Sequence, residues 1–593
     1  MENTDMMDAV PSKKEMPGIT NLKESNCNTG QGKISTSHLN QERYQISCGI
    51  AVVINNTEFD RNLNLQDRVG SDVDAASLFK GFQKLGFKSE LLNDVSKQDM
   101  ERKFDEIKED KTSLEETDCL IVALMSHGNE EEVFLTDGSI KMTTFLSYFN
   151  AENCKELQMK PKIFIIQACR GTDLGSGVEM EVVKDKEPNM RDPNQADAGG
   201  IYNEYDQAYG EPVRIPNAAD FLVVYSTSLG YTAFRTTESG SPFVHHLSEE
   251  LMNISKEDNF YQVLTRVNKK VGMGYRPRHK TSEIVTQMPC FSSHLTKELY
   301  FNLRGMADGI KLDVKDKDTS TTSSTTKETK RNTGQGIINK SHLEQKMYTI
   351  RTGRAVVVNN KEFDSGLGLA DRSGSDEDAS SLFQRFLDLG FESELLSDAT
   401  FKELEEKFQE IKDDKEELQK TDCLIVAVLS HGDENSVYMT DTPVRIKAVM
   451  DYFNAQNCPE LIQQPKVFIF QCSRGQALRD CVNLKVEAGE KENTIPYGLE
   501  TVRIPNEADF LAVYSTSLGD RSFCNTEGSS PFVNQLMKEL QGMKKQDDIY
   551  TVLTKVNNKV MRFEPGNTNS KDIRQMPYFV SHLTKDLYLK QMV

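Results

Sequence analysis

The sequence predicts an α/β protein made of two tandem domains, each with a mostly parallel central sheet flanked by helices. Two observations lead to this fold class. A long segment of the chain repeats itself, and within each copy short apolar runs alternate with segments of helical spacing. The chain has 593 residues, which is more than one hydrophobic core usually supports. Two domains of ordinary enzyme size, joined by a linker, are therefore expected.

The repeat is recognised from motifs that recur at a fixed spacing. The run SHG at 126–128 returns at 430–432, which is 304 positions later. Farther along, the run VRIPN at 213–217 returns at 502–506, which is 289 positions later. The second copy has therefore lost about fifteen residues net between these two motifs.

Composition divides the chain into four parts. Residues 1–41 are polar and are predicted to be a disordered prosegment. Residues 304–346 include the run TSTTSSTT at 319–326, which has no apolar side chain to bury, so we expect a flexible linker. The two domains then occupy residues 42–303 and 347–593.

Within the first copy, strands and helices are predicted from hydrophobic periodicity. Continuous apolar runs of strand length, typical of strands covered on both faces, occur at residues 50–54, 120–124, 163–166 and 221–225. Helical spacing occurs at residues 73–85, 98–107 and 243–252. In such α/β folds functional residues gather where the parallel strands end.

Composition also excludes several classes of protein. The net charge of −20 disfavours nucleic acid and anionic membranes, and no apolar run approaches the ~20 residues of a membrane-spanning helix. Eleven cysteines without CxxC pairs argue against a disulfide framework or a zinc site, so no metal and no cofactor is expected. The N-terminus lacks the features of a secretory signal, and we expect a cytoplasmic protein whose partners are proteins.

Two polar clusters follow predicted strands of the first copy. Ser126-His127-Gly128 comes after one strand and Gln167-Ala168-Cys169-Arg170-Gly171 after another. A single histidine or cysteine is usually structural. A histidine and a cysteine at equivalent positions after two strands that can be neighbours instead indicate a thiol nucleophile with its acid/base partner.

These clusters resemble the signature of the caspases. The pentapeptide QACRG at 167–171, with a histidine upstream, is similar to the caspase motif. The runs RVGSDVDA at 68–75, DFL at 220–222 and LTKELY at 295–300 also resemble caspase motifs, in caspase order. The resemblance implies two caspase-fold domains and an endopeptidase that cleaves after aspartate, in apoptosis or a related cascade.

The resemblance assigns roles to residues of the first copy. It implies that Cys169 is the nucleophile, that His127 is the acid/base, and that the N–H groups of Gly128 and Cys169 bind the oxyanion. A buried P1 aspartate needs fixed donors to offset its desolvation. Three side chains match the family's P1-binding set: Arg68, Gln167 and Arg235.

The second copy departs from this pattern at two positions. Ser473 stands where the first copy has Cys169, and Cys524 stands where it has Arg235. A serine hydroxyl needs a stronger base than a cysteine-protease histidine supplies. The second copy is therefore predicted to be a pseudoprotease, although it keeps three counterparts of the first site: Arg372, His431 and Gln471.

The resemblance also implies a zymogen that matures by cleavage after aspartate. Asp197 lies in a polar connector of the first copy and would separate a large subunit, about 42–197, from a small subunit, about 198–303. Asp8 would trim the N-terminus, and Asp308 would separate the two domains. Residues 481–508 of the second copy contain no aspartate, so we do not expect processing there.

Two functions stay open at this point. The first is an executioner-like protease whose inactive half pairs with the active half, within one chain or between chains, to activate or inhibit it. The alternative is a decoy or scaffold that regulates other caspases or binds their inhibitors. The sequence leaves the P2–P4 preference and the physiological substrates undetermined.

Overall fold

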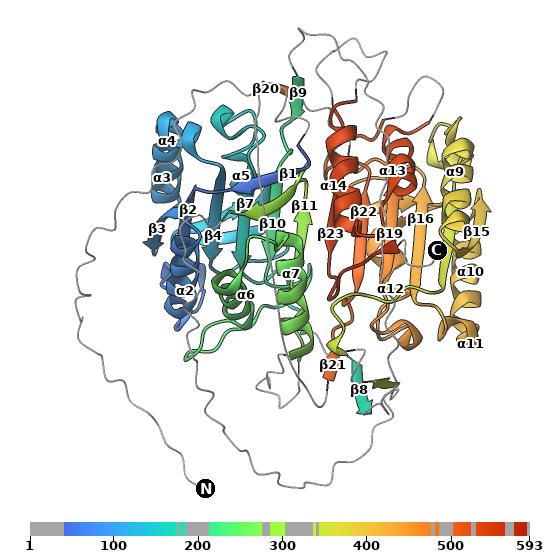
Figure 1. The fold of residues 1–593 in the computed structure, drawn as a ribbon, viewed down its shortest axis with the longest axis horizontal. Helices are drawn as coiled ribbons and strands as arrows, with labels where there is room; N and C mark the ends of the chain where they lie inside the picture. The colour runs from blue at the N-terminus through green and yellow to red at the C-terminus, as the bar shows by residue number, and fades with distance from the viewer. Residues whose placement is uncertain are drawn as a thin grey trace, which may run out of the picture.

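The computed structural model describes residues 41–174, 178–183, 213–274, 285–302, 336–339, 343–475, 481–484, 502–523, 529–563 and 574–589. In each half a central sheet lies between helices, and the two halves stand side by side (Figure 1). Within the described residues no helix is both long and apolar enough to span a bilayer. The eight cysteines whose side chains the structure describes are free thiols.

The first half supplies six strands of the main sheet, in the order β3-β2-β4-β7-β10-β11. Neighbours pair in parallel except β10 and β11, which are antiparallel. The strands are β2 (Gly49–Asn55), β3 (Phe87–Asn93), β4 (Cys119–Met125), β7 (Lys162–Gln167), β10 (Phe221–Tyr225) and β11 (Cys290–Ser293). The predicted mostly parallel sheet is thus confirmed.

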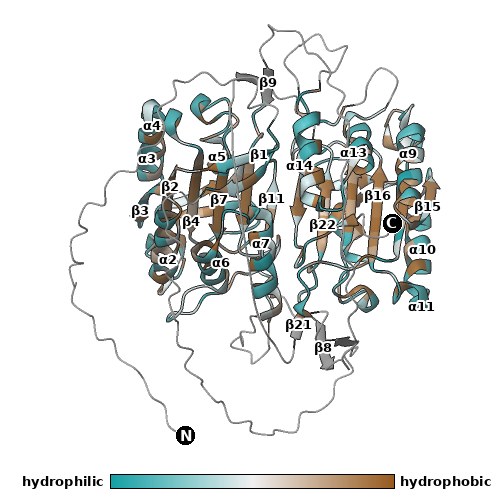
Figure 2. Cartoon of the chain, viewed as in Figure 1, coloured by the Kyte–Doolittle hydropathy of each residue, from teal (hydrophilic) through white to brown (hydrophobic). Residues whose placement is uncertain are grey.

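Helices cover both faces of this sheet. One face carries α2 (Ser71–Lys84), α6 (Pro242–Asn253) and α7 (Phe260–Lys269), followed by a π-helical turn (Lys270–Gly274); the other carries α3 (Lys97–Glu109), α4 (Lys111–Glu116) and α5 (Met142–Ser147). Alternate residues of β2 face the two helix layers: Val53 packs toward α2 and Val52 packs toward α3. The strands are accordingly the most apolar elements (Figure 2).

Small sheets and short connections complete the first half. The hairpin is formed by β5 (Glu132–Leu135) and β6 (Gly138–Lys141), and β1 (Arg43–Ile46) pairs in parallel with β12 (Glu298–Phe301). This half has 3-10 turns at Arg61–Leu63 and Lys155–Leu157, and the second half has one at Ser365–Leu367.

The second half repeats the same order of elements. Its sheet strands are β14 (Gly353–Asn359), β15 (Phe391–Ser397), β16 (Cys423–Leu429), β19 (Lys466–Gln471), β22 (Phe510–Tyr514) and β23 (Tyr578–Ser581). Its hairpin is β17 (Ser436–Tyr438) with β18 (Pro443–Arg445). Its helices are α9 (Ser375–Asp388), α10 (Phe401–Asp413), α11 (Lys415–Leu418), α12 (Ile446–Asp451), α13 (Pro531–Gly542) and α14 (Ile549–Val560), with a 3-10 turn at Pro459–Leu461.

The two halves join into one sheet of twelve strands within a single chain. Antiparallel pairing of β11 with β23 places Phe291 opposite Ser581 and Ser293 opposite Phe579. Helices α7 and α14 lie on either side of this seam (Figure 1). The interface is nearly two-fold symmetric, because Asn268 donates to the Leu583 carbonyl at 3.2 Å and Asn557 donates to the Leu295 carbonyl at 3.1 Å.

The connectors that follow the two nucleophile positions pair across the halves. After Cys169, β8 (Val178–Val183) pairs with β21 (Val502–Ile504) of the second half. After Ser473, β20 (Cys481–Leu484) pairs with β9 (Val213–Pro216) of the first. Each half therefore orders a segment that leaves the other half's site.

The prediction of a flexible linker over residues 304–346 is wrong for its last part. There β13 (Gly336–Asn339) pairs in parallel with β8, and Leu343 is buried in a small cluster with Met273 and Ile504. The physical reason is that β8 has a free edge and that this part of the linker, unlike the Thr/Ser run before it, contains apolar residues.

Candidate active site

The two polar clusters of the first half lie together at the carboxyl edge of the sheet. Strands β4 and β7 pair in parallel with Met125 opposite Gln167, and the Ser126 N–H donates to the Gln167 carbonyl at 3.1 Å. The backbone at Gly128 packs closely on the cysteine segment, because a Cβ there would stand 2.7 Å from the Cys169 carbonyl oxygen. The structure therefore brings His127, Gly128 and Cys169 to one place.

His127 is held in a defined orientation. Its Nε2 lies 2.7 Å from the Gln66 carbonyl oxygen, and its ring packs on Phe59 with centroids 4.9 Å apart. Since a carbonyl can only accept, Nε2 carries the proton and Nδ1 is left as the acceptor. Burial lowers the pKa of His127, and the nearby charges of Arg68 and Arg235 lower it further. The ring is therefore neutral at physiological pH and can take a proton.

Cys169 differs from the structural cysteines of the first half. Its side chain is half-buried, and its Sγ lies 3.8 Å from the Ala233 carbonyl oxygen. Cys119 and Cys154 lie inside the core, and burial raises the pKa of each thiol, so neither supplies thiolate at neutral pH. Accessibility and the neighbouring histidine single out Cys169 as the candidate nucleophile.

Two arginines stand close together beside Cys169. Arg68 is 2% exposed and donates to the Asn56 carbonyl at 2.9 Å, while half-buried Arg235 donates to the Val69 carbonyl at 3.1 Å. Burial lowers the pKa of Arg68 to about 9, and the positive charge of Arg235 contributes to that shift. A guanidinium with so perturbed a pKa is in an environment that favours binding of an anion.

The negative charge of Asp74 acts on both arginines, but its oxygens already have a partner. Both of its oxygens accept the Ser241 N–H, at 2.9 and 3.1 Å, and burial raises the pKa of Asp74 to about 6. Gln167 also borders the site, and its buried Oε1 has no hydrogen-bond partner. That oxygen is an acceptor, so the donors that the pocket offers a substrate carboxylate are the guanidinium N–H groups of Arg68 and Arg235 and the amide N–H groups of Gln167.

Gln287 is a positioning residue that the sequence interpretation missed. Its Oε1 accepts the Phe234 N–H at 2.8 Å, and its Nε2 donates to the Ser226 carbonyl at 2.6 Å. It therefore ties the segment that carries Arg235 to the end of β10. The signal was available, since the run QMP at 287–289 recurs at 575–577 in the repeat.

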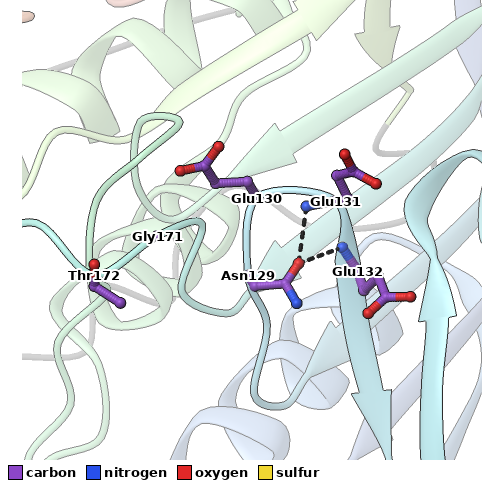
Figure 3. A pocket seen from close by; sticks show the side chains of 6 residues that line it. All are labelled: Asn129, Glu130, Glu131, Glu132, Gly171 and Thr172. Carbon is purple, nitrogen blue, oxygen red and sulfur yellow. Dashed lines mark hydrogen bonds between the residues drawn. The ribbon is translucent and has the colours of Figure 1, made fainter.

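An acidic hollow of about 380 Å³ adjoins the two catalytic segments (Figure 3). Its lining comes from the loop after His127 and the loop after Cys169, namely Asn129, Glu130, Glu131, Glu132, Gly171 and Thr172. Asn129 Oδ1 accepts the N–H groups of Glu131 and Glu132 at 2.9 and 2.8 Å, which fixes the turn. The hollow shares no lining residue with the arginine pocket. It can therefore contact a part of a bound peptide other than the P1 side chain.

The second half preserves the geometry of the histidine and of one arginine but not the nucleophile. His431 Nε2 lies 2.7 Å from the Ala370 carbonyl oxygen, and its ring packs on Phe363 at 4.9 Å. Ser473 occupies the nucleophile position, where its Oγ accepts the Ser522 N–H at 3.2 Å. Arg372 keeps the backbone contact of Arg68, at 2.7 Å to the Asn360 carbonyl.

The pocket of the second half is occupied by its own side chains. Gln471 donates to the Ser522 Oγ at 3.0 Å, and this serine replaces Ala233 of the first half. Cys472, beside Ser473, is buried in the core, and burial raises the pKa of its thiol to about 11, so it does not substitute as nucleophile. Four residues of the predictions lie outside the described part of the chain: Asp8, Asp197, Asp308 and Cys524.

Comparison with known proteins gives a consistent picture. The caspase domain family model matches residues 48–300 and 352–588. Caspase-3 of Oryctolagus cuniculus is 36% identical over 256 residues, covering 43% of this chain and 83% of that protein. Caspase-3 of Bos taurus is 36% identical over 255 residues, covering 43% and 84%. A solved structure of caspase-1 from Spodoptera frugiperda covers 44% of this chain and 94% of its own, with 29% identity and a TM-score of 0.37.

Proposed function

Because this chain belongs to the caspase family, with a caspase domain in each half, we propose that its first domain is an active endopeptidase and its second an inactive partner. The first domain cleaves peptide bonds after aspartate. The observation that carries the proposal is the meeting of His127 and Cys169 at one sheet edge, beside the paired guanidinium groups of Arg68 and Arg235.

The chemistry follows from these positions. Arg68, Arg235 and Gln167 bind the P1 carboxylate, and the Cys169 sulfur attacks the carbonyl carbon of the bond after it. The backbone N–H groups of Gly128 and Cys169 stabilise the oxyanion. Imidazole at His127 takes the thiol proton and passes it to the leaving amine, and water then hydrolyses the thioester with the same imidazole as base.

The departing half of the substrate lies over the acidic hollow. The arginine pocket takes the P1 side chain, whereas the hollow is lined by residues just after His127 and Cys169. A peptide that continues past the cleaved bond meets three glutamates there. Basic side chains on the primed side are therefore favoured over acidic ones.

The second domain is inactive for two reasons. Its nucleophile position holds Ser473, whose hydroxyl is far less acidic than a thiol. Its pocket has Ser522 hydrogen-bonded to Gln471, and Cys524 takes the sequence position of Arg235. A P1 carboxylate entering there would have to displace Ser522 and would lack one cation.

The inactive domain acts as the pairing partner of the active one. Tyr261, Phe291, Tyr550 and Phe579 pack together across the seam, with ring centroids between 5.0 and 6.4 Å apart. His294 of the first domain stacks on Tyr578 of the second at 4.8 Å, and Tyr578 in turn accepts from Arg474 at 2.8 Å. The covalent linker keeps the two domains at a high effective concentration.

Three further properties belong to the same proposal. The enzyme is made as a zymogen that is processed after aspartates of the first connector, it resides in the cytoplasm, and it acts in apoptosis or a related cascade. The caspase-3 relatives support the last point.

Hydrolysis of aspartyl tetrapeptide substrates by full-length variants tests the proposal. Cys169→Ala should lower activity by roughly 10⁴-fold or more, as expected for loss of a nucleophile, while Ser473→Ala should leave activity unchanged. The reverse pattern would reject it. If the wild-type protein cleaves nothing and instead suppresses an added active caspase, the decoy function is correct.

A further inference from the structure

Helix α6 carries a group of metal-ligand side chains outside the active site. His245, His246 and Glu249 follow one another on it, and their potential ligand atoms all lie within 4.8 Å of one another. Two imidazoles and one carboxylate form a ligand set that suits Zn²⁺ and leaves a fourth position for water. Among the described residues, no other group of three or more histidine, cysteine, aspartate or glutamate side chains is close enough to share one ion.

The three side chains already face one another. His246 Nδ1 lies 3.2 Å from the Glu249 Oε2, and the rings of His245 and His246 meet at 5.0 Å and 71°. Ligand atoms of a tetrahedral zinc site, with bonds of about 2.1 Å, are about 3.4 Å apart. The widest separation must therefore shrink by about 1.4 Å, and His245 and Glu249 are exposed, so that no core packing opposes a change of rotamer.

A cation competes for the carboxylate. Lys270 Nζ lies 2.8 Å from Glu249 Oε2 and also 2.8 Å from Glu250 Oε1. When Glu249 turns toward a metal ion, the lysine keeps Glu250 as its partner. An exposed pair of this kind contributes little to stability, so the lysine weakens metal binding without preventing it.

The second domain lacks this group. Its positions equivalent to His245, His246 and Glu249 hold Asn534, Gln535 and Lys538, 289 residues later. No imidazole is present there, and an ammonium replaces the carboxylate. The chain therefore contains its own matched control for the site.

We propose that His245, His246 and Glu249 bind a single Zn²⁺ ion on the surface of the first domain. The ligands form a His-His-x-x-Glu run on one helix, so the site contains no cysteine and differs from the CxxC zinc motifs that the sequence lacks. Zn²⁺ binding would fix three side chains in the first two turns of α6. This helix begins next to Ser241, whose N–H donates to Asp74. The site does not depend on peptidase activity.

The test uses the untagged full-length protein carrying Cys169→Ala, so that the active-site thiol cannot bind metal. Calorimetric titration with Zn²⁺ should give one site. Replacing His245, His246 and Glu249 by the residues of the second domain (H245N, H246Q, E249K) should weaken that site at least about tenfold, since even loss of a second-shell partner costs that much. Lys270→Gln should strengthen it several-fold.

Titration with Co²⁺ identifies the ligands. Visible absorption bands typical of Co²⁺ with nitrogen and oxygen ligands would support the proposal. A thiolate-to-Co²⁺ charge-transfer band would place the metal on a cysteine and overturn it. Unchanged Zn²⁺ affinity in the triple variant would also overturn it. If the triple variant does not fold, as judged by circular dichroism, the single variant His245→Asn decides the question with the same readout.

Discussion

In both domains a histidine follows the same strand and lies 2.7 Å from a backbone carbonyl oxygen, Gln66 in the first and Ala370 in the second. The pockets beside these histidines differ. Ala233 leaves the first pocket open, whereas Ser522 holds Gln471 in the second at 3.0 Å. The backbone frame around the histidine is therefore the same in both domains, and the two sites differ in a few side chains.

The arginine after each nucleophile position extends the comparison. Arg170 stacks on Tyr225 at 3.7 Å and contacts the Cys290 sulfur at 3.6 Å. Arg474 is fixed more firmly, because it donates to the Glu434 carbonyl at 2.5 Å and to the Tyr578 hydroxyl at 2.8 Å. The second loop is thus tied to the seam between the domains, which fits a structural rather than a catalytic role.

Repair of the second site gives the largest expected effect. In the Cys169→Ala background, Ser473→Cys, Ser522→Ala and Cys524→Arg together restore the nucleophile, free Gln471 and return the second cation. We expect labelling by a thiol-reactive aspartyl ketone to be about 30- to 5,000-fold faster than with Ser473→Cys alone, by the arithmetic for one charged pair. The control is Ser473→Cys alone, which should label weakly. Equal labelling by the control would mean that the nucleophile is the only difference between the sites.

Damage to the first site is the converse experiment. Arg235→Cys copies the residue of the second domain and leaves the P1 carboxylate with one cation. We expect a loss of about 2–5 kcal/mol in transition-state binding, which is about 30- to 5,000-fold in kcat/KM. Arg43→Ala, far from the pocket, is the matched control. A loss below threefold for Arg235→Cys would remove that residue from the P1 site.

The helix caps at the seam form a third contrast. Asn259 begins α7 and donates to Glu298 at 2.8 Å, while its counterpart Asp548 begins α14 and accepts the Thr551 N–H at 2.7 Å. Burial and the charge of Glu298 raise the pKa of Asp548 to about 7, and burial raises the pKa of Asp586 to about 6. Their charged forms are therefore disfavoured in the folded protein.

The sign of the pH effect follows from those shifts. A carboxyl whose folded-state pKa lies above 3.8 stabilises the fold below that pH, and this contribution is lost as pH rises through 6–7. The other charged groups facing these carboxyls are Asp258, Arg266, Lys269 and Lys346. Asp548→Asn keeps the cap but removes the buried charge.

The matched swap tests this contrast by urea unfolding. We expect Asp548→Asn to raise the free energy of unfolding by about 2–3 kcal/mol more at pH 8 than at pH 5, because the unfolded carboxyl is ionised at both values while the folded one releases its proton near pH 7. Asn259→Asp should do the opposite at pH 8, because it places a carboxylate beside Glu298. A gain for Asp548→Asn that is equal at both pH values would show that the folded protein has already released the Asp548 proton by pH 5, so that its pKa is not raised to about 7.

Much of this architecture could be predicted from sequence. The apolar runs gave the strands, and the repeat gave the second domain, because burial on both faces leaves a continuous pattern. The strand ends placed His127 beside Cys169 for the same reason. Hydrophobic periodicity could not predict that the two domains pair within one chain, because β11 and β23 are far apart in the sequence and pair only in the folded protein.

Other features escaped because they depend on contacts between distant segments. Gln287 clamps the Arg235 segment from far along the chain, and Ser522 fills a pocket formed by another loop. The strand Gly336–Asn339 was hidden by the polar run before it, and only the free edge of β8 explains why it is ordered. The replacement of Ala233 by Ser522 in the second domain does not change the hydrophobic periodicity, so the sequence pattern does not reveal that the pocket is filled.

The acidic hollow gives the smallest expected effect and the finest comparison. The second domain holds Asn435 and Ser436 where the first holds Glu131 and Glu132. The double variant Glu131→Asn, Glu132→Ser therefore gives the first domain the smaller negative charge of the second. Glu131 is also 3.5 Å from exposed Lys141, which reduces its field. Exposed charge pairs contribute roughly 0.2–1 kcal/mol each, so the preference should be small.

Internally quenched peptides that differ only in a primed-side lysine or glutamate measure this preference. The wild-type protein should favour the lysine peptide by about 2- to 5-fold in kcat/KM at low salt, and the preference should decline as ionic strength rises. The double variant, which keeps only Glu130 of the three glutamates, should show a smaller preference for the lysine peptide and keep the activity of the wild type on tetrapeptides that end at P1. If the variant keeps the full lysine preference, the leaving half of the substrate takes another path, and the difference between the two loops does not affect specificity.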